Sequence, residues 1–147
     1  MSKKLSFKGQ IAMGLEDRIR LQTLTGKTGY QIKEFKIMGQ TPGDATSEYI
    51  AQIYSKDGQA IGNLVNFTND ALLAVCYTST TSSGNSVYFE TVIFDNQVFN
   101  QNIFVQITDV SGGTVPCNYY IELETIALSD VEATQLTLKN LRNIASR

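Results

Sequence analysis

Few residues in this 147-residue chain could carry catalysis, because the sequence contains no histidine. Serine–histidine–aspartate and cysteine–histidine nucleophile systems are thereby excluded, and acid–base chemistry would fall on carboxylates, lysines or tyrosines. The best-spaced carboxylates are Glu122 and Glu124, which share one face of a strand, as glycosidase carboxylates do in some sheets. Two acids so placed more often form a solvated surface. We therefore predict no catalytic residues and no enzyme activity.

Metal and cofactor sites are not indicated either. The two cysteines, Cys76 and Cys117, lie in apolar runs without ligand spacing, which favours buried free thiols over a zinc site or a disulfide. Oxygen ligands for calcium occur near predicted turns, but their spacing matches no defined calcium loop: Asp95, Asn96, Asn100, Asn102 and Asp109. We predict no bound metal and no cofactor.

The tripeptide Gly26-Lys27-Thr28 resembles part of a phosphate-binding loop. That loop requires a further glycine five positions earlier and a helix afterwards. Leu21 occupies the first position, and a β-like run follows at residues 30–38. The segment is better explained as a hairpin turn in which glycines supply positive φ.

Charge is distributed unevenly along the chain. Residues 57–138 contain nine acidic side chains and no lysine or arginine, whereas all 12 basic residues lie in the two flanking segments. Such asymmetry can direct docking onto a partner or head-to-side assembly of identical copies. The alternative is that folding interleaves the strands and mixes the charges. The candidate partner-binding residues are the basic side chains near the two ends: Lys3, Lys4, Lys8, Lys139, Arg142 and Arg147.

The basic N-terminal segment, residues 1–8, suggests a nucleic-acid contact at first sight. It has no interleaved aromatic beyond Phe7 and no basic helix, so a solvated arm is the better interpretation and no nucleic-acid partner is predicted. The N-terminus lacks the apolar segment of a secretory signal, and no run approaches 18 apolar residues. We expect neither Sec-dependent export nor membrane insertion.

The elements that must position these side chains are mostly strands. Residues 87–107 are the densest run of aromatic and β-branched residues and predict two or three buried strands. Residues 71–77 predict a strand buried on both faces, with a short helix as the alternative. Residues 117–125 alternate most cleanly, with Cys117, Tyr119, Ile121 and Leu123 on the buried face. A slip in apolar register predicts a bulge near Lys33 and Glu34.

The end of the chain changes period. Ser129 or Asp130 can cap a helix with Glu132 at the favoured third position, and apolar residues then recur at helical spacing. A final strand over residues 135–141 is the alternative. The whole pattern predicts an all-β, jelly-roll-like antiparallel sandwich of about eight strands with a short C-terminal helix. We expect one domain over residues 1–147, with residues 1–8 as a basic arm and 129–147 as a helix or tail.

Two blocks of sequence, KLSFKGQIAMGLEDRIRL near the N-terminus and residues 95–144, resemble small virion-associated proteins of marine tailed bacteriophages. The resemblance covers most of the chain and carries no functional motif. It implies a structural protein of the capsid surface that binds the major capsid protein in many copies. The resemblance also implies a homo-oligomer that assembles onto the particle in the host cytoplasm. The alternative is a receptor- or carbohydrate-binding sandwich of a tail or capsid fibre knob, using polar loops at residues 39–47 and 78–86 and surface tyrosines.

Overall fold

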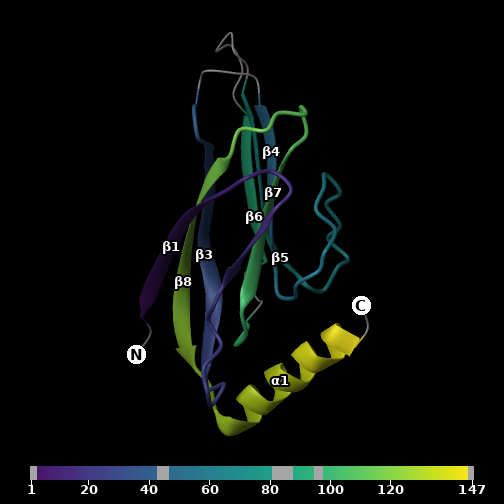
Figure 1. Cartoon of the computed structure of the whole chain (residues 1–147). Coiled ribbons are helices and arrows are strands. Elements are labelled where there is room, and N and C mark those ends of the chain that lie inside the picture. Colours follow the sequence, from purple (N-terminus) through teal and green to yellow (C-terminus); the bar gives the residue numbers. More distant parts are fainter. Residues whose placement is uncertain (1–2, 43–46, 81–87, 95–97, 146–147) are drawn as a thin grey trace.

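The computed structural model describes residues 3–42, 47–80, 88–94 and 98–145, with Thr80 and residues 140–145 described by their backbone alone. Within these ranges the chain forms eight strands and one helix (Figure 1). The elements are β1 (Lys4–Ile11), β2 (Glu16–Ile19), β3 (Thr28–Gly39), β4 (Ser47–Tyr54), β5 (Leu72–Thr80), β6 (Tyr88–Ile93), β7 (Ile103–Asp109), β8 (Cys117–Ala127) and α1 (Asp130–Ala145).

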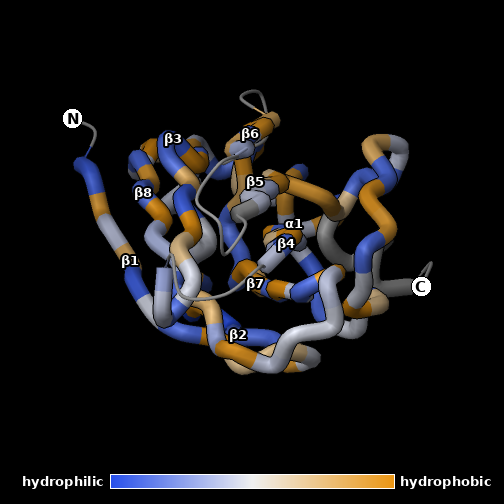
Figure 2. Tube along the Cα trace, turned by 90° about the horizontal axis from the view of Figure 1, so that it is seen from above, coloured by the Kyte–Doolittle hydropathy of each residue, from blue (hydrophilic) through white to orange (hydrophobic). Residues whose placement is uncertain are grey.

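The strands form two antiparallel sheets packed face to face. One sheet has the order β1-β8-β3 and the other the order β2-β7-β4-β5-β6. Figure 2 looks down the sandwich and shows the two layers, with β1 and β2 on the same flank. The prediction of an antiparallel β-sandwich with about eight strands and a C-terminal helix is therefore confirmed.

The strand order is that of a jelly roll with one exchange. A jelly roll folds a long antiparallel ribbon that pairs the first strand with the eighth, the second with the seventh, the third with the sixth and the fourth with the fifth. Here β1 pairs with β8, β2 with β7 and β4 with β5. The sixth strand instead pairs with β5. It touches β3 through the hydroxyl of Thr91, which donates to the carbonyl of Phe35 at 3.3 Å.

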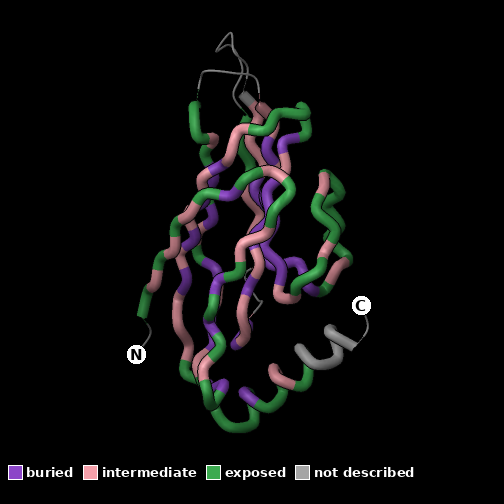
Figure 3. Tube along the Cα trace, viewed as in Figure 1, coloured by how far each residue is buried: buried purple, intermediate pink, exposed green. Residues whose placement is uncertain are grey.

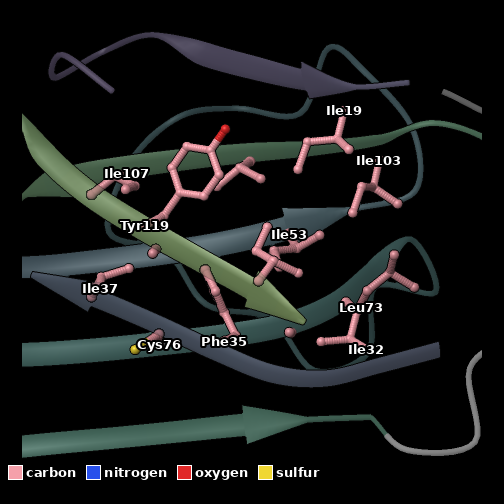
Figure 4. Close-up of a cluster of buried hydrophobic side chains, with 14 of the residues drawn as sticks. Ile19, Ile32, Phe35, Ile37, Ile53, Leu73, Cys76, Ile103, Ile107 and Tyr119 are labelled. Atoms are coloured by element: carbon pink, nitrogen blue, oxygen red, sulfur yellow. The ribbon is translucent and has the colours of Figure 1, made fainter. Parts of the chain in front are cut away.

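The core lies between the two sheets and consists of side chains at alternate positions along the strands (Figures 3 and 4). The predicted buried face of β8 is confirmed, because Cys117, Ile121 and Leu123 have no exposed surface and Tyr119 is also buried. The apolar run at residues 71–77 is a strand, with residues 71–76 buried. The predicted bulge is also present, since the β3–β8 register shifts between Ile32 and Glu34.

The prediction for residues 87–107 is only partly correct. β7 is core, with Ile103, Val105 and Ile107 fully buried. β6, however, is the edge strand of the larger sheet, and Tyr88 and Phe89 are 53% and 55% exposed. High β-propensity fits a pleated, half-buried surface and does not distinguish a central strand from an edge. Val87 and the turn at residues 95–97 lie outside the described residues.

The predicted basic arm is wrong from residue 4 onward. β1 pairs with β8 along its whole length, from Lys4 opposite Glu124 to Ile11 opposite Cys117. Even Lys3 is tied to the sheet, because its amide donates to Thr125 Oγ1 at 2.9 Å and its carbonyl accepts from the Thr125 amide. The alternating Leu5 and Phe7 pack against the core, so apolar burial overrides the repulsion between neighbouring lysines.

The C-terminal helix is confirmed and the alternative final strand is wrong. The Ser129 amide donates to Glu132 Oε1 at 3.1 Å, and the Glu132 amide donates to Ser129 Oγ at 3.2 Å, which is a capping box. Ala133 is buried, while Val131 and Leu138 are 66% and 53% exposed. In Figure 1 the helix extends away from the end of the sandwich. In the described part of the chain, no helix is long and apolar enough to cross a membrane.

The two predicted polar loops are shorter than expected where they are described. β3 extends to Gly39 and β4 begins at Ser47, while residues 78–80 continue β5. The sequence TSTTSSGNS is rich in hydroxyls, which favours a loop, yet threonine also has high β-propensity and the register with β4 extends the ladder to Thr80. Residues 43–46 and 81–87 lie outside the described residues.

Candidate functional site

A cluster of two tyrosines and two glutamates lies on the outer face of the larger sheet. We call Glu48, Tyr77, Tyr88 and Glu90 the tyrosine–glutamate patch. The rings of Tyr77 and Tyr88 are 5.7 Å apart with planes tilted by 57°. The Tyr77 hydroxyl donates to Glu48 Oε2 and the Tyr88 hydroxyl donates to Glu90 Oε2, each at 2.5 Å. Each aromatic ring is thus held by a carboxylate acceptor.

The strand register explains why these four residues meet. In β5 and β6, Tyr77 is opposite Glu90 and Ser79 is opposite Tyr88, so Tyr77 and Tyr88 are diagonal neighbours on one face. In β4, Ile50 is opposite Tyr77, and Glu48 lies two residues along on the same face. The core faces of the same strands carry Ala51, Ala74 and Cys76 instead. The patch is therefore a property of strand pairing and not of any continuous motif.

The carboxylates keep both phenols protonated. A hydrogen bond to Glu48 raises the pKa of Tyr77, and a hydrogen bond to Glu90 raises the pKa of Tyr88, because a phenolate would face a carboxylate. Two neutral phenol rings can stack on the apolar face of a planar ligand or a sugar. The carboxylates beside them can accept hydrogen bonds from the hydroxyl groups of the same ligand. The arrangement suits the binding of a ligand with an apolar face and a polar rim.

The outer face of the smaller sheet mixes charges within one molecule. Lys4 Nζ lies 3.6 Å from Glu122 Oε1, and Lys33 Nζ lies 3.9 Å from Glu124 Oε2. These contacts join the basic N-terminal segment to acids of the acidic middle. The fold therefore does interleave part of the charge. Glu122 and Glu124 each contact a separate lysine on an open sheet face, which favours the interpretation of a solvated, ion-paired surface over a glycosidase pair.

The structure brings together only some of the predicted partner-binding residues. Lys3, Lys4 and Lys8 lie exposed along β1. Lys139 is exposed on α1, and this helix runs away from β1 (Figure 1). Arg142 lies on α1 where the backbone alone is described, and Arg147 is outside the described residues. The two ends of the chain thus do not form one basic site in the described structure.

Two further arginines that the sequence reasoning missed extend the basic surface. Arg18 and Arg20 are exposed on and just after β2, beside an open depression of about 560 Å³. Leu24, which is fully exposed, and Asn102 also line this depression. Asn102 Oδ1 accepts hydrogen bonds from the amides of Leu21 and Gln22. We call Lys3, Lys4, Lys8, Arg18 and Arg20 the basic flank. The spacing Arg18-Ile19-Arg20 was the available signal, since both arginines must point away from buried Ile19.

Three of the residues considered for calcium, Asn100, Asn102 and Asp109, form hydrogen bonds with main-chain groups. Asp109 Oδ1 accepts from the Glu48 amide, the Ser111 amide and the Ser111 hydroxyl. Asn100 is buried and donates to the Gly26 carbonyl at 3.0 Å. Among the described residues no group of three or more histidine, cysteine or acidic side chains could hold a metal ion. Asp95 and Asn96 lie outside these residues.

Both cysteines are free and buried, in agreement with the sequence prediction. Burial raises the pKa of Cys76, and burial raises the pKa of Cys117 to about 12. Thiolate is the reactive form of cysteine, so these side chains act as small apolar core residues.

No family model matches this sequence, and no curated protein matches it. The features of this protein that bear on its function are therefore the sandwich itself and two distinctive surfaces, the basic flank and the tyrosine–glutamate patch.

Proposed function

We propose that this protein is a structural virion protein that decorates a bacteriophage capsid by binding the major capsid protein in many copies. The observation that carries the proposal is the jelly-roll-like strand order, which differs from a jelly roll only in the pairing of β6; jelly rolls recur in viral capsid and lectin domains. Fold alone does not specify function. The sequence resemblance to virion-associated proteins supports the capsid choice within that class.

The basic flank supports the proposal as a docking surface. Lys3, Lys4 and Lys8 follow one edge of the smaller sheet, and Arg18 and Arg20 follow the adjoining edge of the larger sheet (Figure 2). The Lys4 side chain is 70% exposed, so its ion pair with Glu122 holds it weakly and a partner's carboxylates can compete for it. A surface of this sign complements an acidic region of a capsid protein and would accelerate association.

Purified phage particles test this proposal directly. Quantitative mass spectrometry should find the protein at a fixed ratio to the major capsid protein, and cryo-EM should show its sandwich on the shell. Absence from purified particles would refute the proposal. Charge reversal of Lys3 and Lys8 to Glu should weaken capsid binding and make the remaining binding less sensitive to salt. Lys36→Glu, an exposed lysine on the other side of β8, is the matched control.

The tyrosine–glutamate patch favours carbohydrate or receptor binding as a second candidate function. The exposed ring of Tyr88 and the half-buried ring of Tyr77 provide a stacking surface, and the two carboxylates provide the hydrogen-bond acceptors that a sugar requires. Glycan arrays with the wild-type protein and with Tyr88→Ala test it. Tyr120→Ala is a suitable control, because Tyr120 donates to Glu122 on the outer face of the other sheet. Arrays that show no binding would exclude this candidate.

A further inference from the structure

β6 is an edge strand without the usual protection of an edge. Natural edge strands are guarded by lysine, proline, bulges or short length, because their unpaired main-chain groups invite another strand. At the three other edges of the two sheets, β1 carries Lys4 and Lys8, β2 has only four residues, and β3 carries two lysines and a bulge. β6, with the sequence YFETVI, has no lysine, proline or glycine, and Tyr88 and Phe89 at its start are more than half exposed.

The hydrogen bonds to β5 determine which main-chain groups of β6 are available. The Phe94 amide donates to the Leu73 carbonyl at 3.1 Å. In an antiparallel ladder alternate residues point to the same neighbour, so Glu90 and Val92 also point to β5. The N–H and C=O groups of Phe89, Thr91 and Ile93 therefore point to the free edge. No strand of the described chain is paired with that edge.

We propose that a second copy of this chain pairs with β6 in antiparallel orientation about a two-fold axis at Thr91. In this arrangement Phe89 exchanges main-chain hydrogen bonds with Ile93 of the second copy, and the two Thr91 residues exchange theirs with each other. These are the residues whose main-chain groups face the free edge, so the hydrogen-bond parity of the pairing is correct. An isologous contact of this kind closes at two copies.

The side chains are complementary to themselves in the same register. Tyr88 lies opposite Phe94 of the second copy, Phe89 opposite Ile93, and Glu90 opposite Val92. Aromatic rings thus meet aromatic or β-branched neighbours, and the two carboxylates are not directly opposed. An axis at Glu90 would oppose the two carboxylates and would match residues that already bond to β5. The axis at Thr91 is also the one that uses the whole described segment from Tyr88 to Phe94.

Pairing at this edge makes the two larger sheets continuous, with their outer faces on the same side. The tyrosine–glutamate patches of the two copies then lie on one surface, on either side of the axis, which gives the dimer two equivalent sites for a repetitive partner. The inference concerns how copies associate and does not depend on the proposed capsid function. If the protein binds capsids as a monomer, this inference is refuted while the proposed capsid function stands.

Site-specific disulfide formation tests the register. Directly opposed Glu90 and Val92 would form a non-hydrogen-bonded pair with Cα atoms about 4.5 Å apart, which a disulfide can bridge. A mixture of Glu90→Cys and Val92→Cys proteins should form a covalent dimer under mild oxidation. Either variant alone should not, because identical positions are diagonal, about 7–8 Å apart. The buried Cys76 and Cys117 point into the core and stay protected. Equal cross-linking in all three samples, or none, would overturn the proposal.

Sedimentation equilibrium of the full-length protein measures the association itself. The wild-type protein should show a concentration-dependent monomer–dimer equilibrium. On the main chain, Phe89→Pro removes one N–H that faces the free edge, a position where an edge strand accepts proline, and it also removes the ring that would lie opposite Ile93 of the second copy. It removes two intermolecular hydrogen bonds by symmetry, and the dissociation constant should rise about tenfold or more. Met38→Lys, an exposed apolar residue on β3, should leave the equilibrium unchanged. A wild-type monomer, or a dimer indifferent to Phe89→Pro, would refute the inference.

Discussion

Gly9 leaves the space that the ring of Tyr119 occupies. The two residues are opposite each other in β1 and β8, and a Cβ atom on Gly9 would lie 2.6 Å from the Tyr119 hydroxyl oxygen and 2.8 Å from two ring carbons. The same hydroxyl donates to Asp17 Oδ2 at 3.1 Å and so connects the smaller sheet to β2 of the larger one. A side chain at position 9 would therefore disturb the hydrogen bond between Tyr119 and Asp17, which connects the two sheets on this flank.

Gly9→Ala should destabilise the protein by about 1–3 kcal/mol, the usual cost of overpacking, because the ring and the strand cannot both keep their positions. Chemical denaturation followed by circular dichroism measures the change. Gly62→Ala is the matched control, since a Cβ atom at Gly62 would contact nothing within 4 Å. Equal stability of the two variants would show that Tyr119 moves away from Gly9 without cost.

Ser129→Ala should loosen the first turn of α1 by about 1 kcal/mol, because it removes the acceptor of the Glu132 amide. Hydrogen exchange of the amides in the first turn measures the loss. The main-chain and side-chain hydrogen bonds with Ser129 also lower the pKa of Glu132 below 4.5. A carboxyl group whose pKa is lower in the folded state stabilises the fold when the pH is above its pKa in the unfolded state. This stabilisation is lost as the pH falls through its pKa in the folded state. The helix start should therefore loosen below pH 4.5, and less so in Glu132→Gln, where position 132 no longer titrates and only Asp130 remains acidic in the first turn.

Glu48→Gln should lower the pKa of Tyr77 toward 10, because the acceptor that opposes formation of the phenolate becomes neutral. Both tyrosines of the patch have raised pKa values in the folded protein. Their hydrogen bonds therefore stabilise the fold fully below pH 10 and lose this effect as the pH rises through the folded values. NMR titration of the ring resonances resolves the two residues. Glu90→Gln should likewise lower the pKa of Tyr88 and should leave the hydrogen bond from Tyr77 to Glu48 intact.

Ile103→Ala and Phe89→Ala should differ sharply, although both residues belong to the same apolar stretch. Ile103 is fully buried between the sheets, so truncation should cost about 2–5 kcal/mol. Phe89 is 55% exposed at the edge of β6, and its truncation should cost less than about 1 kcal/mol in the monomer. Thermal denaturation at low protein concentration compares them. Similar losses of stability would mean that β6 is buried in solution.

Much of the fold follows from local patterns in the sequence. The alternation of β8, the bulge between Ile32 and Glu34 and the capping box of Ser129 and Glu132 each depend on residues a few positions apart. The backbone geometry of strands and helices sets those spacings, so the sequence alone is sufficient to predict them. The absence of histidine likewise excludes whole classes of catalytic site on composition alone.

The surfaces of the molecule are decided by long-range strand pairing. Main-chain hydrogen bonds are nearly indifferent to side-chain identity, so a run such as residues 87–107 does not reveal which of its strands becomes an edge. β6 pairs with β5 and not with β3, as it would in a jelly roll, and this pairing leaves Tyr88 exposed and beside Tyr77. The pairing of β1 with β8 likewise converts a predicted arm into a strand and sets Lys4 against Glu122. Local periodicity thus determines the elements, whereas only the tertiary structure decides which side chains share a surface.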